Sequence, residues 1–177
     1  MRLFIAIELS KNMKSEIELA RASLIKSSAG GRFVSIENMH LTLRFLGESN
    51  NSFGAVNAIS ESARGIRPFP IHLGGYGFFG GGPFTSYLNV LGDLSELNAI
   101  YDSLQSALFD EGFSREYKRF SPHITLGRNV IHDDKTVETM NALRLQASMQ
   151  VQSITLFEST RGKNGMIYTA MHRERFK

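Results

Sequence analysis

The segment His40-Leu41-Thr42-Leu43 has a counterpart of the same pattern in His123-Ile124-Thr125-Leu126. Both segments alternate between a polar residue, histidine or threonine, and an aliphatic one. Because side chains alternate between the two faces of a β-strand, the histidine and threonine of each segment face the same way, and the aliphatic residues face the core. Each segment therefore predicts a strand that presents one imidazole and one hydroxyl on a single rigid surface.

Elements of similar type surround the two segments. The hydrophobic pattern predicts a strand over residues 3–9, a helix from Ser10 to about residue 27 and a second helix over residues 53–64. This second helix is expected to turn four residues inward: Phe53, Val56, Ile59 and Ala63. Around the second segment, strands and helices follow in the same order, and residues 149–158 are predicted to form one strand.

The matching order favours a diverged duplication. The strand that opens each half is separated from its histidine by nearly the same number of residues. We therefore expect a single domain over 1–177, made of two pseudo-symmetric lobes of about 1–80 and 84–177, whose terminal segments can be exchanged between lobes. An ordinary alternating α+β arrangement also produces such spacing.

Two facing lobes would bring two imidazoles and two hydroxyls to one site. Two histidines with pKa values near neutrality can act as general base and general acid in a single step. Phosphodiester cleavage needs both roles, since one group activates the nucleophile and the other protonates the leaving alkoxide. Threonine hydroxyls can donate hydrogen bonds to the phosphate oxygens, and Arg128 is the nearest cation after His123.

Two other interpretations of the histidines stay open. A histidine on a strand is commonly a structural residue, although two copies in equivalent positions argue against this. A metal site is a weaker interpretation, because each segment brings one ligand and no neighbouring carboxylate or second histidine. We therefore expect neither a metal nor a cofactor.

Composition excludes several classes of protein. The 177 residues contain 20 Lys+Arg and 17 Asp+Glu, and 42% of them are hydrophobic, which is typical of a globular chain. No cysteine is present, which excludes disulfides, thiolate zinc sites and cysteine nucleophiles. A net charge of +3 is too small to identify a nucleic-acid-binding protein. No stretch is long and apolar enough to span a membrane, so a cytoplasmic protein without a membrane partner is expected.

The motifs together resemble the 2H phosphoesterase superfamily and, within it, the bacterial and archaeal RNA 2′,3′-cyclic phosphodiesterases, historically called 2′-5′ RNA ligases. The resemblance covers nearly the whole chain and rests on four blocks: residues 2–7 (RLFIAI), 37–47 (ENMHLTLRFLG), 120–128 (FSPHITLGR) and 156–159 (LFES). It implies a bilobal α+β fold with an antiparallel sheet in each lobe, helices on the outer faces and a central cleft. It also implies metal-independent hydrolysis of a 2′,3′-cyclic phosphate to a 2′-phosphomonoester, with weak reverse 2′-5′ ligation.

The resemblance implies a role for each residue of the motifs. Both histidines carry catalysis, Thr42 and Thr125 contact phosphate, and Arg128 assists. We assign His40 as the acid that protonates the departing 3′ oxygen and His123 as the base that activates water, although the symmetry of the site allows the reverse. Where relatives usually carry a tryptophan, in the strand that opens the second half, this chain has Ser86-Tyr87-Leu88-Asn89-Val90.

Further contacts with the base or the RNA chain are expected from five residues: Phe45, Phe84, Tyr87, Lys118 and Arg119. Such aromatic residues are also common in cores, and such charges are common on solvated faces. The stretch Gly75-Tyr76-Gly77-Phe78-Phe79-Gly80 has the spacing of a nucleotide-binding loop, but no amphipathic helix follows it. We therefore interpret it as a loop or cleft rim.

The sequence predicts a monomeric enzyme whose substrate is RNA with a 2′,3′-cyclic phosphate end. Two alternatives remain. The same chemistry could act on a small cyclic nucleotide or on a 2′-5′ oligonucleotide bond, or the chain could be a non-catalytic module that binds RNA ends.

Overall fold

Two antiparallel sheets form the framework of the protein, whose computed structural model describes residues 1–177. The four-stranded sheet has the order β3–β1–β8–β9, with bounds His40–Glu48, Arg2–Glu8, Ser153–Gly162 and Gly165–Arg175. The five-stranded sheet has the order β2–β6–β5–β4–β7, with bounds Gly30–Phe33, His123–Ile131, Phe84–Leu91, Phe69–Phe79 and Ser148–Val151. The predicted α+β class with two antiparallel sheets is confirmed.

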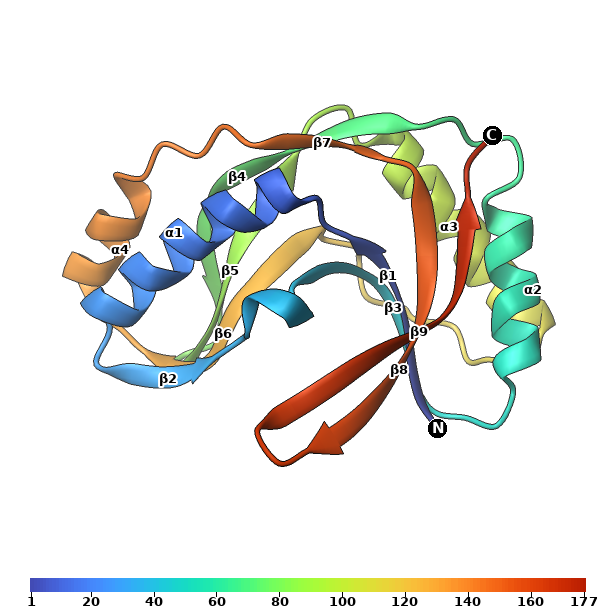
Figure 1. The fold of residues 1–177 in the computed structure, drawn as a ribbon, viewed down its shortest axis with the longest axis horizontal. Coiled ribbons are helices and arrows are strands. Elements are labelled where there is room, and N and C mark those ends of the chain that lie inside the picture. Colours follow the sequence, from blue (N-terminus) through green and yellow to red (C-terminus); the bar gives the residue numbers. More distant parts are fainter.

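Four α-helices lie on the outer sides of the two sheets (Figure 1). α1 (Lys11–Ser27) and α4 (Asp134–Asn141) cover the five-stranded sheet, and the Thr136 hydroxyl of α4 donates a hydrogen bond to the Ser27 carbonyl oxygen at 2.8 Å. α2 (Ser52–Ser62) and α3 (Ser95–Asp110) pack against each other beside the four-stranded sheet. The expected position of the helices on the outer faces is confirmed. None of these helices is both long and apolar enough to cross a membrane.

The two sheets do not correspond to the two halves of the sequence. β4, from the first half, lies between β5 and β7, whereas β8 and β9, from the second half, complete the four-stranded sheet. The expected boundary between residues 80 and 84 therefore falls inside the five-stranded sheet. The reason is local, because the turn at Gly80-Gly81-Gly82 joins β4 and β5 as an antiparallel hairpin. Each sheet thus combines strands from both halves of the sequence.

The single strand predicted over residues 149–158 is two strands that belong to different sheets. β7 ends at Val151 and β8 begins at Ser153, and Gln152 between them carries the chain from the five-stranded to the four-stranded sheet. The apolar pattern continues through this crossing because Val151 and Ile154, on either side of it, are both fully buried in the same core.

The first two helices form where they were predicted, and Ile59 and Ala63 of the second are buried as expected, but one of its side chains is not. α1 begins after Ser10, whose side chain accepts a hydrogen bond from the Met13 amide, and its buried residues are Met13, Ile17, Ala20 and Leu24. In α2, however, the side chain of Phe53 is 75% exposed. Asn51 caps this helix through the Gly54 amide, and the buried face is made of smaller residues: Gly54, Ala55, Ala58, Ile59 and Ser62.

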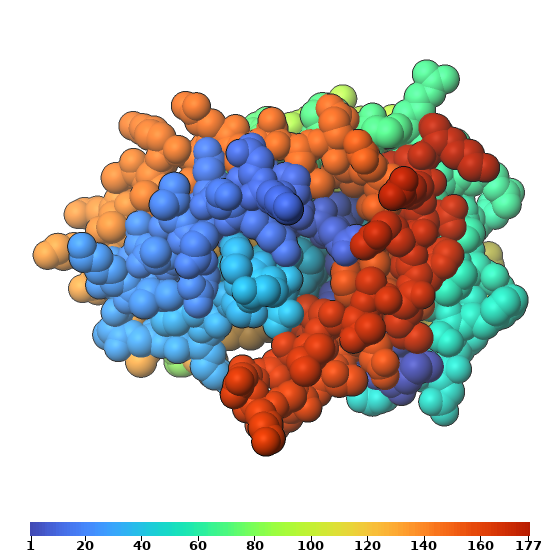
Figure 2. Space-filling view, in the orientation of Figure 1, coloured from blue at the N-terminus to red at the C-terminus, as the bar shows by residue number.

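The core is continuous between the two sheets. One cluster of 34 buried residues contains Ile5 and Leu41 from the four-stranded sheet as well as Leu88 and Ile124 from the five-stranded sheet. A second, small cluster of Phe4, Ala6 and Phe157 lies on the opposite face of β1 and β8, because side chains alternate along each strand. This opposite face also carries the first histidine. On the surface, the molecule is hollowed between the segment around β2 and the tip of the β8–β9 hairpin (Figure 2).

Candidate active site

His40 and His123 are the first residues of β3 and β6, two strands that contact each other across the two sheets. Both are held in the same way. Nδ1 of His40 is 2.7 Å from the Asn38 carbonyl oxygen, and Nδ1 of His123 is 2.7 Å from the Ser121 carbonyl oxygen. Because a carbonyl oxygen only accepts hydrogen bonds, Nδ1 carries the proton in each neutral ring. Nε2 of each histidine is then left to accept or deliver a proton.

A β-bulge at the same position in both motif strands changes which residues share the face of the histidine. In β3, Thr42 pairs with Ala6 and Arg44 with Ile5, so Leu43 is the extra residue. In β6, Thr125 pairs with Tyr87 and Gly127 with Ser86, so Leu126 is the extra residue. An extra residue reverses the alternation beyond it.

The consequence of the bulges is that Phe45 and Arg128 join the faces that carry the two His–Thr pairs. Regular alternation would have placed both on the opposite faces. Phe45 pairs directly with Phe4, whose ring lies 4.8 Å from the ring of His40. Arg44 instead turns to the other side, where it is buried, forms a 2.6 Å ion pair with Glu116 and donates to the carbonyl oxygen of Ser114.

The electrostatics of His40 involve charges from outside its own sheet. Burial lowers the pKa of His40 below 6.5, the carbonyl oxygen of Asn38 opposes this, and the positive charges of Arg128 and Lys14 lower the pKa further. Arg128 belongs to the five-stranded sheet and His40 to the four-stranded one, so the structure brings these two predicted site residues together. Both threonine hydroxyls are on partly buried residues of the same strands.

Lys14 is a cation near His40 that the sequence analysis did not point to. It lies in the first turn of α1, and its ammonium group donates a hydrogen bond to the Glu37 carbonyl oxygen at 3.2 Å. This holds it close enough to His40 to influence its pKa. The only sequence signal was that Lys14 is a cation next to the buried Met13, a pattern shared by many surface helices.

Aromatic rings surround both histidines. The ring of His40 lies 4.8 Å from that of Phe4 and 5.4 Å from that of Tyr168, whereas the ring of His123 lies 5.1 Å from Tyr87 and 5.3 Å from Phe79. Phe79 and Tyr87 also stack on each other at 4.4 Å. The sequence analysis expected Tyr87 at the site, but it missed Phe4 and Tyr168, which are far from both motifs in the sequence.

Gly77 makes the position of Tyr87 possible. The two residues pair directly between β4 and β5, and a Cβ atom at Gly77 would lie 2.6 Å from atoms of the Tyr87 ring. The glycine-rich stretch therefore forms part of a strand in which one glycine leaves room for an aromatic ring. It is not a nucleotide-binding loop.

Phe84 is not brought to the site, contrary to the expectation that it contacts RNA. Its ring stacks on His132 at 4.2 Å and meets the edge of Phe78 at 5.0 Å. Phe78 follows Gly77 in β4 and so faces away from Tyr87. Phe45, in contrast, is 57% exposed on the His40 side. Phe84 and Tyr87 are three residues apart in β5, so alternation along the strand turns Phe84 away from the face of Tyr87.

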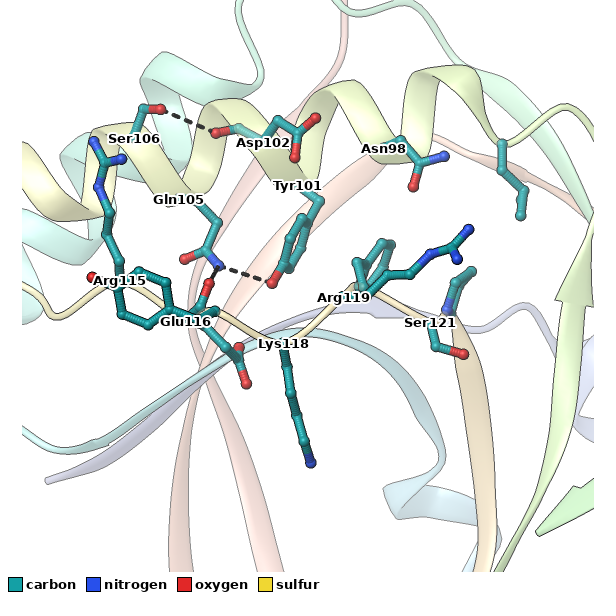
Figure 3. A pocket seen from close by; sticks show the side chains of 14 residues that line it. Asn98, Tyr101, Asp102, Gln105, Ser106, Arg115, Glu116, Lys118, Arg119 and Ser121 are labelled. Atoms are coloured by element: carbon teal, nitrogen blue, oxygen red, sulfur yellow. Dashed lines mark hydrogen bonds between the residues drawn. The ribbon is translucent and has the colours of Figure 1, made fainter. Parts of the chain in front are cut away.

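Lys118 and Arg119 lie in the segment that leads from α3 to β6. They line a pocket of about 1020 Å³ together with side chains of α3. Figure 3 shows Arg119 extending toward Asn98, while Lys118 points away from the helix. The segment ends at Ser121, whose carbonyl oxygen holds His123. No group of three or more His, Asp or Glu side chains is arranged to hold a metal ion.

This arrangement has the parts of an acid–base site for an anionic substrate. Two imidazoles with a free Nε2, two hydroxyls and a guanidinium group line facing strands, and the pKa of one imidazole lies below its usual value. No carboxylate hydrogen-bonds to either histidine.

Comparison with known proteins gives a consistent result. The chain is 32% identical to the RNA 2′,3′-cyclic phosphodiesterase of Thermotoga maritima, with 100% of this chain and 96% of that protein covered. It is 30% identical to the protein of the same name from Methanothermobacter thermautotrophicus, with 96% of each covered.

Solved structures agree with the sequence relatives. Escherichia coli LigT complexed with 3′-AMP superposes with a TM-score of 0.78 at 28% identity, over 99% of this chain and 97% of that one. TT0787 of Thermus thermophilus, at 24% identity and a TM-score of 0.81, shares the fold over 99% of this chain and 98% of that one. Residues 15–163 match the family described as the 2′-5′ RNA ligase superfamily. The resemblance found in the sequence is thereby confirmed, and the chain belongs to the 2′-5′ RNA ligase superfamily.

Proposed function

We propose that the protein hydrolyses 2′,3′-cyclic phosphates at RNA ends to 2′-phosphomonoesters, and that His40 and His123 act as an acid–base pair without a metal. The observation that carries the proposal is the matched setting of the two histidines. Each begins a motif strand, each has Nδ1 bound to the carbonyl oxygen two residues earlier, and the two strands contact each other, with the charge of Arg128 on β6 acting on His40. The names of the full-length relatives support the same reaction.

In the proposed step, Nε2 of His123 removes a proton from a water molecule as its oxygen attacks phosphorus. The bond from phosphorus to the 3′ oxygen breaks, and that oxygen takes a proton from Nε2 of His40. One water molecule is consumed, so the products are a 3′ hydroxyl and a 2′-phosphomonoester. The hydroxyls of Thr42 and Thr125 donate hydrogen bonds to the nonbridging oxygens, and Arg128 stabilises the charge that builds up on them.

The lowered pKa of His40 constrains this assignment. In the free site, burial and the charges of Arg128 and Lys14 favour the neutral ring, whereas a general acid must be protonated. An anionic phosphate beside His40 would counter both cations and raise its pKa, because a nearby negative charge favours the protonated form. The proposed acid is therefore charged by the arrival of the substrate.

The same acid–base pair also supports ligation. When a 5′ hydroxyl takes the place of water, His123 removes its proton as its oxygen attacks phosphorus, and His40 protonates the departing 3′ oxygen, which leaves a 2′-5′ phosphodiester bond. Cleavage of that bond back to the cyclic phosphate uses the two histidines in exchanged roles, so weak, reversible 2′-5′ ligation is part of the proposal. Both histidines come from one chain, which supports a monomer as the active unit. The proposed partner is an RNA end, and we place this activity in the cytoplasm without a membrane partner.

The proposed pseudo-symmetry of the two lobes accounts for the matched site. The strand orders β3–β1–β8 and β6–β5–β4 are equivalent, and each places the motif strand beside the strand that opens its half. The bulges at Leu43 and Leu126 also correspond. These matches support a duplication with exchanged elements. In it, β4 and α1 from the first half lie with the five-stranded sheet, and β8 and α3 from the second half lie with the four-stranded sheet.

One experiment tests the proposed reaction against its rivals. The protein is given a 2′,3′-cyclic mononucleotide, its 3′,5′-cyclic isomer, a 2′-5′-linked dinucleotide and an oligoribonucleotide with a 2′,3′-cyclic end, all with EDTA present. The products are separated against 2′- and 3′-phosphate standards. We expect both 2′,3′-cyclic substrates to yield only the 2′-phosphate. A 3′-phosphate product would contradict the leaving group, and activity lost on chelation would contradict the metal-free site. Binding of the RNA end without turnover would identify a binding module.

A further inference from the structure

A pocket of about 1020 Å³ lies between α3 and residues 115–122, the segment that leads into β6 (Figure 3). Pockets that take small molecules usually measure about 300–1,000 Å³, so this one has room for much more than a single phosphate group. None of the catalytic residues proposed above lines it. Its presence therefore needs an explanation of its own.

The wall of this pocket is fixed by specific contacts. The rings of Tyr101 on α3 and Phe120 on the segment stack at 4.3 Å with an angle of 9° between them. Nε2 of Gln105 donates a hydrogen bond to the Tyr101 hydroxyl at 2.8 Å and to the Glu116 carbonyl oxygen at 3.2 Å. The buried Arg44 of β3 binds the same segment from the sheet side. The segment is thus held at a set distance from the helix.

The charges that line the pocket favour an anionic ligand. Three cations line it, namely Arg115, Lys118 and Arg119. The two carboxylates in the lining are Asp102 and Glu116, and Glu116 is already paired with the guanidinium group of Arg44 at 2.6 Å. An excess of positive charge with amide and aromatic groups nearby is the pattern that single-stranded nucleic acid requires, since cations bind the backbone and rings stack on the bases.

Suitable neighbouring groups are present. Arg119 extends into the space beside Asn98, whose amide can pair with the edge of a base (Figure 3). The ring of Tyr117 is 94% exposed at the same pocket and is free to stack. The pocket and the active site share one segment, because Ser121 lines the pocket and its carbonyl oxygen holds Nδ1 of His123 at 2.7 Å.

We propose that this pocket binds the single-stranded RNA on the 5′ side of the terminal cyclic phosphate, with Arg119 on a backbone phosphate of that RNA. The inference rests on the proposed function and specifies the substrate as an RNA chain rather than a free nucleotide. Nucleotides upstream of the reacting end add binding energy that a mononucleotide lacks. The enzyme therefore prefers oligonucleotides through KM.

The test compares kcat/KM for a 2′,3′-cyclic mononucleotide with that for a tetranucleotide that has the same terminal base and a 2′,3′-cyclic end. We expect a higher value for the tetranucleotide. In Arg119→Gln the ratio of the two values should fall about tenfold, because a hydrogen bond to a charged group is lost. The dependence of tetranucleotide binding on log salt should also become less steep by about 0.7, the amount for one phosphate contact with a single strand.

The matched control is Arg144→Gln, which removes the same charge from an exposed residue just beyond α4, at the opposite end of the molecule from α3 (Figure 1). Its ratio should equal that of the wild type. An unchanged ratio in Arg119→Gln, or an equal fall in both variants, would overturn the pocket proposal while leaving the reaction intact. A wild-type protein that does not turn over the mononucleotide would instead overturn the proposed function.

Discussion

The side-chain amide of Asn38 donates a hydrogen bond to the carbonyl oxygen of Met166 at 2.7 Å, between residues 128 positions apart in the sequence. The carbonyl oxygen of Asn38 in turn accepts from Nδ1 of His40, also at 2.7 Å. Asn38 therefore ties the position and tautomer of His40 to the start of β9. The carbonyl oxygen of Ser121 holds Nδ1 of His123 in the same way. The side chain of Ser121, unlike that of Asn38, makes no hydrogen bond to another strand.

This difference predicts unequal effects of two small truncations. In Asn38→Ala the carbonyl oxygen stays but loses its tether to Met166, so the ring of His40 is less well oriented. We expect kcat to fall about ten- to hundredfold with little change in KM, because small misplacements of catalytic groups are costly. Ser121→Ala removes only a hydroxyl and serves as the control. Steady-state kinetics on a 2′,3′-cyclic nucleotide decide the matter, and equal kcat values in the two variants would contradict the tethering role.

The faces of the motif strands could be predicted from sequence only up to the bulges. The His–Thr pairs lie as alternation requires, and the helices that cover the sheets follow from their apolar spacing. Arg128 was expected at the phosphate although regular alternation would have turned it away. It reaches the site through the extra residue Leu126, and the backbone irregularity that causes this has no signature in the pattern of apolar and polar residues.

Long-range pairing was the other feature that local patterns could not supply. Residues 149–158 have one continuous apolar pattern, but the strand changes sheets at Gln152. Phe53 occupies an apolar position of a helix that buries alanines instead. Lys14 approaches His40 from α1, which packs on the five-stranded sheet, and Tyr168 approaches it from β9, which pairs with β8 in the four-stranded sheet. These features depend on contacts between segments far apart in the chain, so the local sequence pattern does not predict them.

Loss of either catalytic histidine should abolish most of the activity. We expect His40→Ala and His123→Ala each to lower kcat by about 10²–10⁴-fold, the usual contribution of general acid–base catalysis. His72→Ala is the control, since His72 is an exposed residue on β4 outside the site, and it should retain full activity. Circular dichroism should show that all three variants keep their fold. Full activity in either of the first two would exclude that residue from the mechanism.

A sulfur-substituted substrate should separate the acid from the base. When sulfur replaces the 3′ bridging oxygen, the leaving thiolate needs no proton, because thiols are far more acidic than alcohols. His40→Ala should therefore regain much of the lost rate on this substrate, and His123→Ala should not. Rates on the oxygen and sulfur substrates are compared for each variant. Rescue of His123→Ala alone would reverse the assigned roles.

The pKa of His40 gives a prediction about charge at the site. Burial lowers it below 6.5, and Arg128 and Lys14 lower it further. Lys14→Gln removes one of these charges, so the pKa of His40 should move up toward 6.5. NMR titration of the ring protons of His40 measures this directly, with Lys135→Gln on the distant α4 as the control. A wild-type midpoint at or above 6.5, or no upward shift in Lys14→Gln, would contradict the electrostatic account.

The lowered pKa of His40 also determines the direction in which the free energy of unfolding changes with pH. Because folding favours the neutral ring of His40, its contribution to the free energy of unfolding is fully present above pH 6.5 and is lost as the pH falls through the lower folded-state pKa. Burial also lowers the pKa of His132, which adds to the effect in the same direction. Urea unfolding between pH 7.5 and 5 should therefore show decreasing stability. A rise over this range would contradict both pKa directions.

Two glycines of β4 provide a matched test of the aromatic surface beside His123. A methyl group at Gly77 would lie 2.6 Å from the Tyr87 ring, whereas one at Gly75 would meet no atom within 4 Å. Gly77→Ala must therefore displace Tyr87 from its place beside His123. If Tyr87 stacks on the terminal base, KM for 2′,3′-cyclic nucleotides should rise about fivefold or more, since such stacking is worth about 1–3 kcal/mol. Gly75→Ala should leave KM unchanged, and so identical KM values for the two variants would show that Tyr87 does not bind the base.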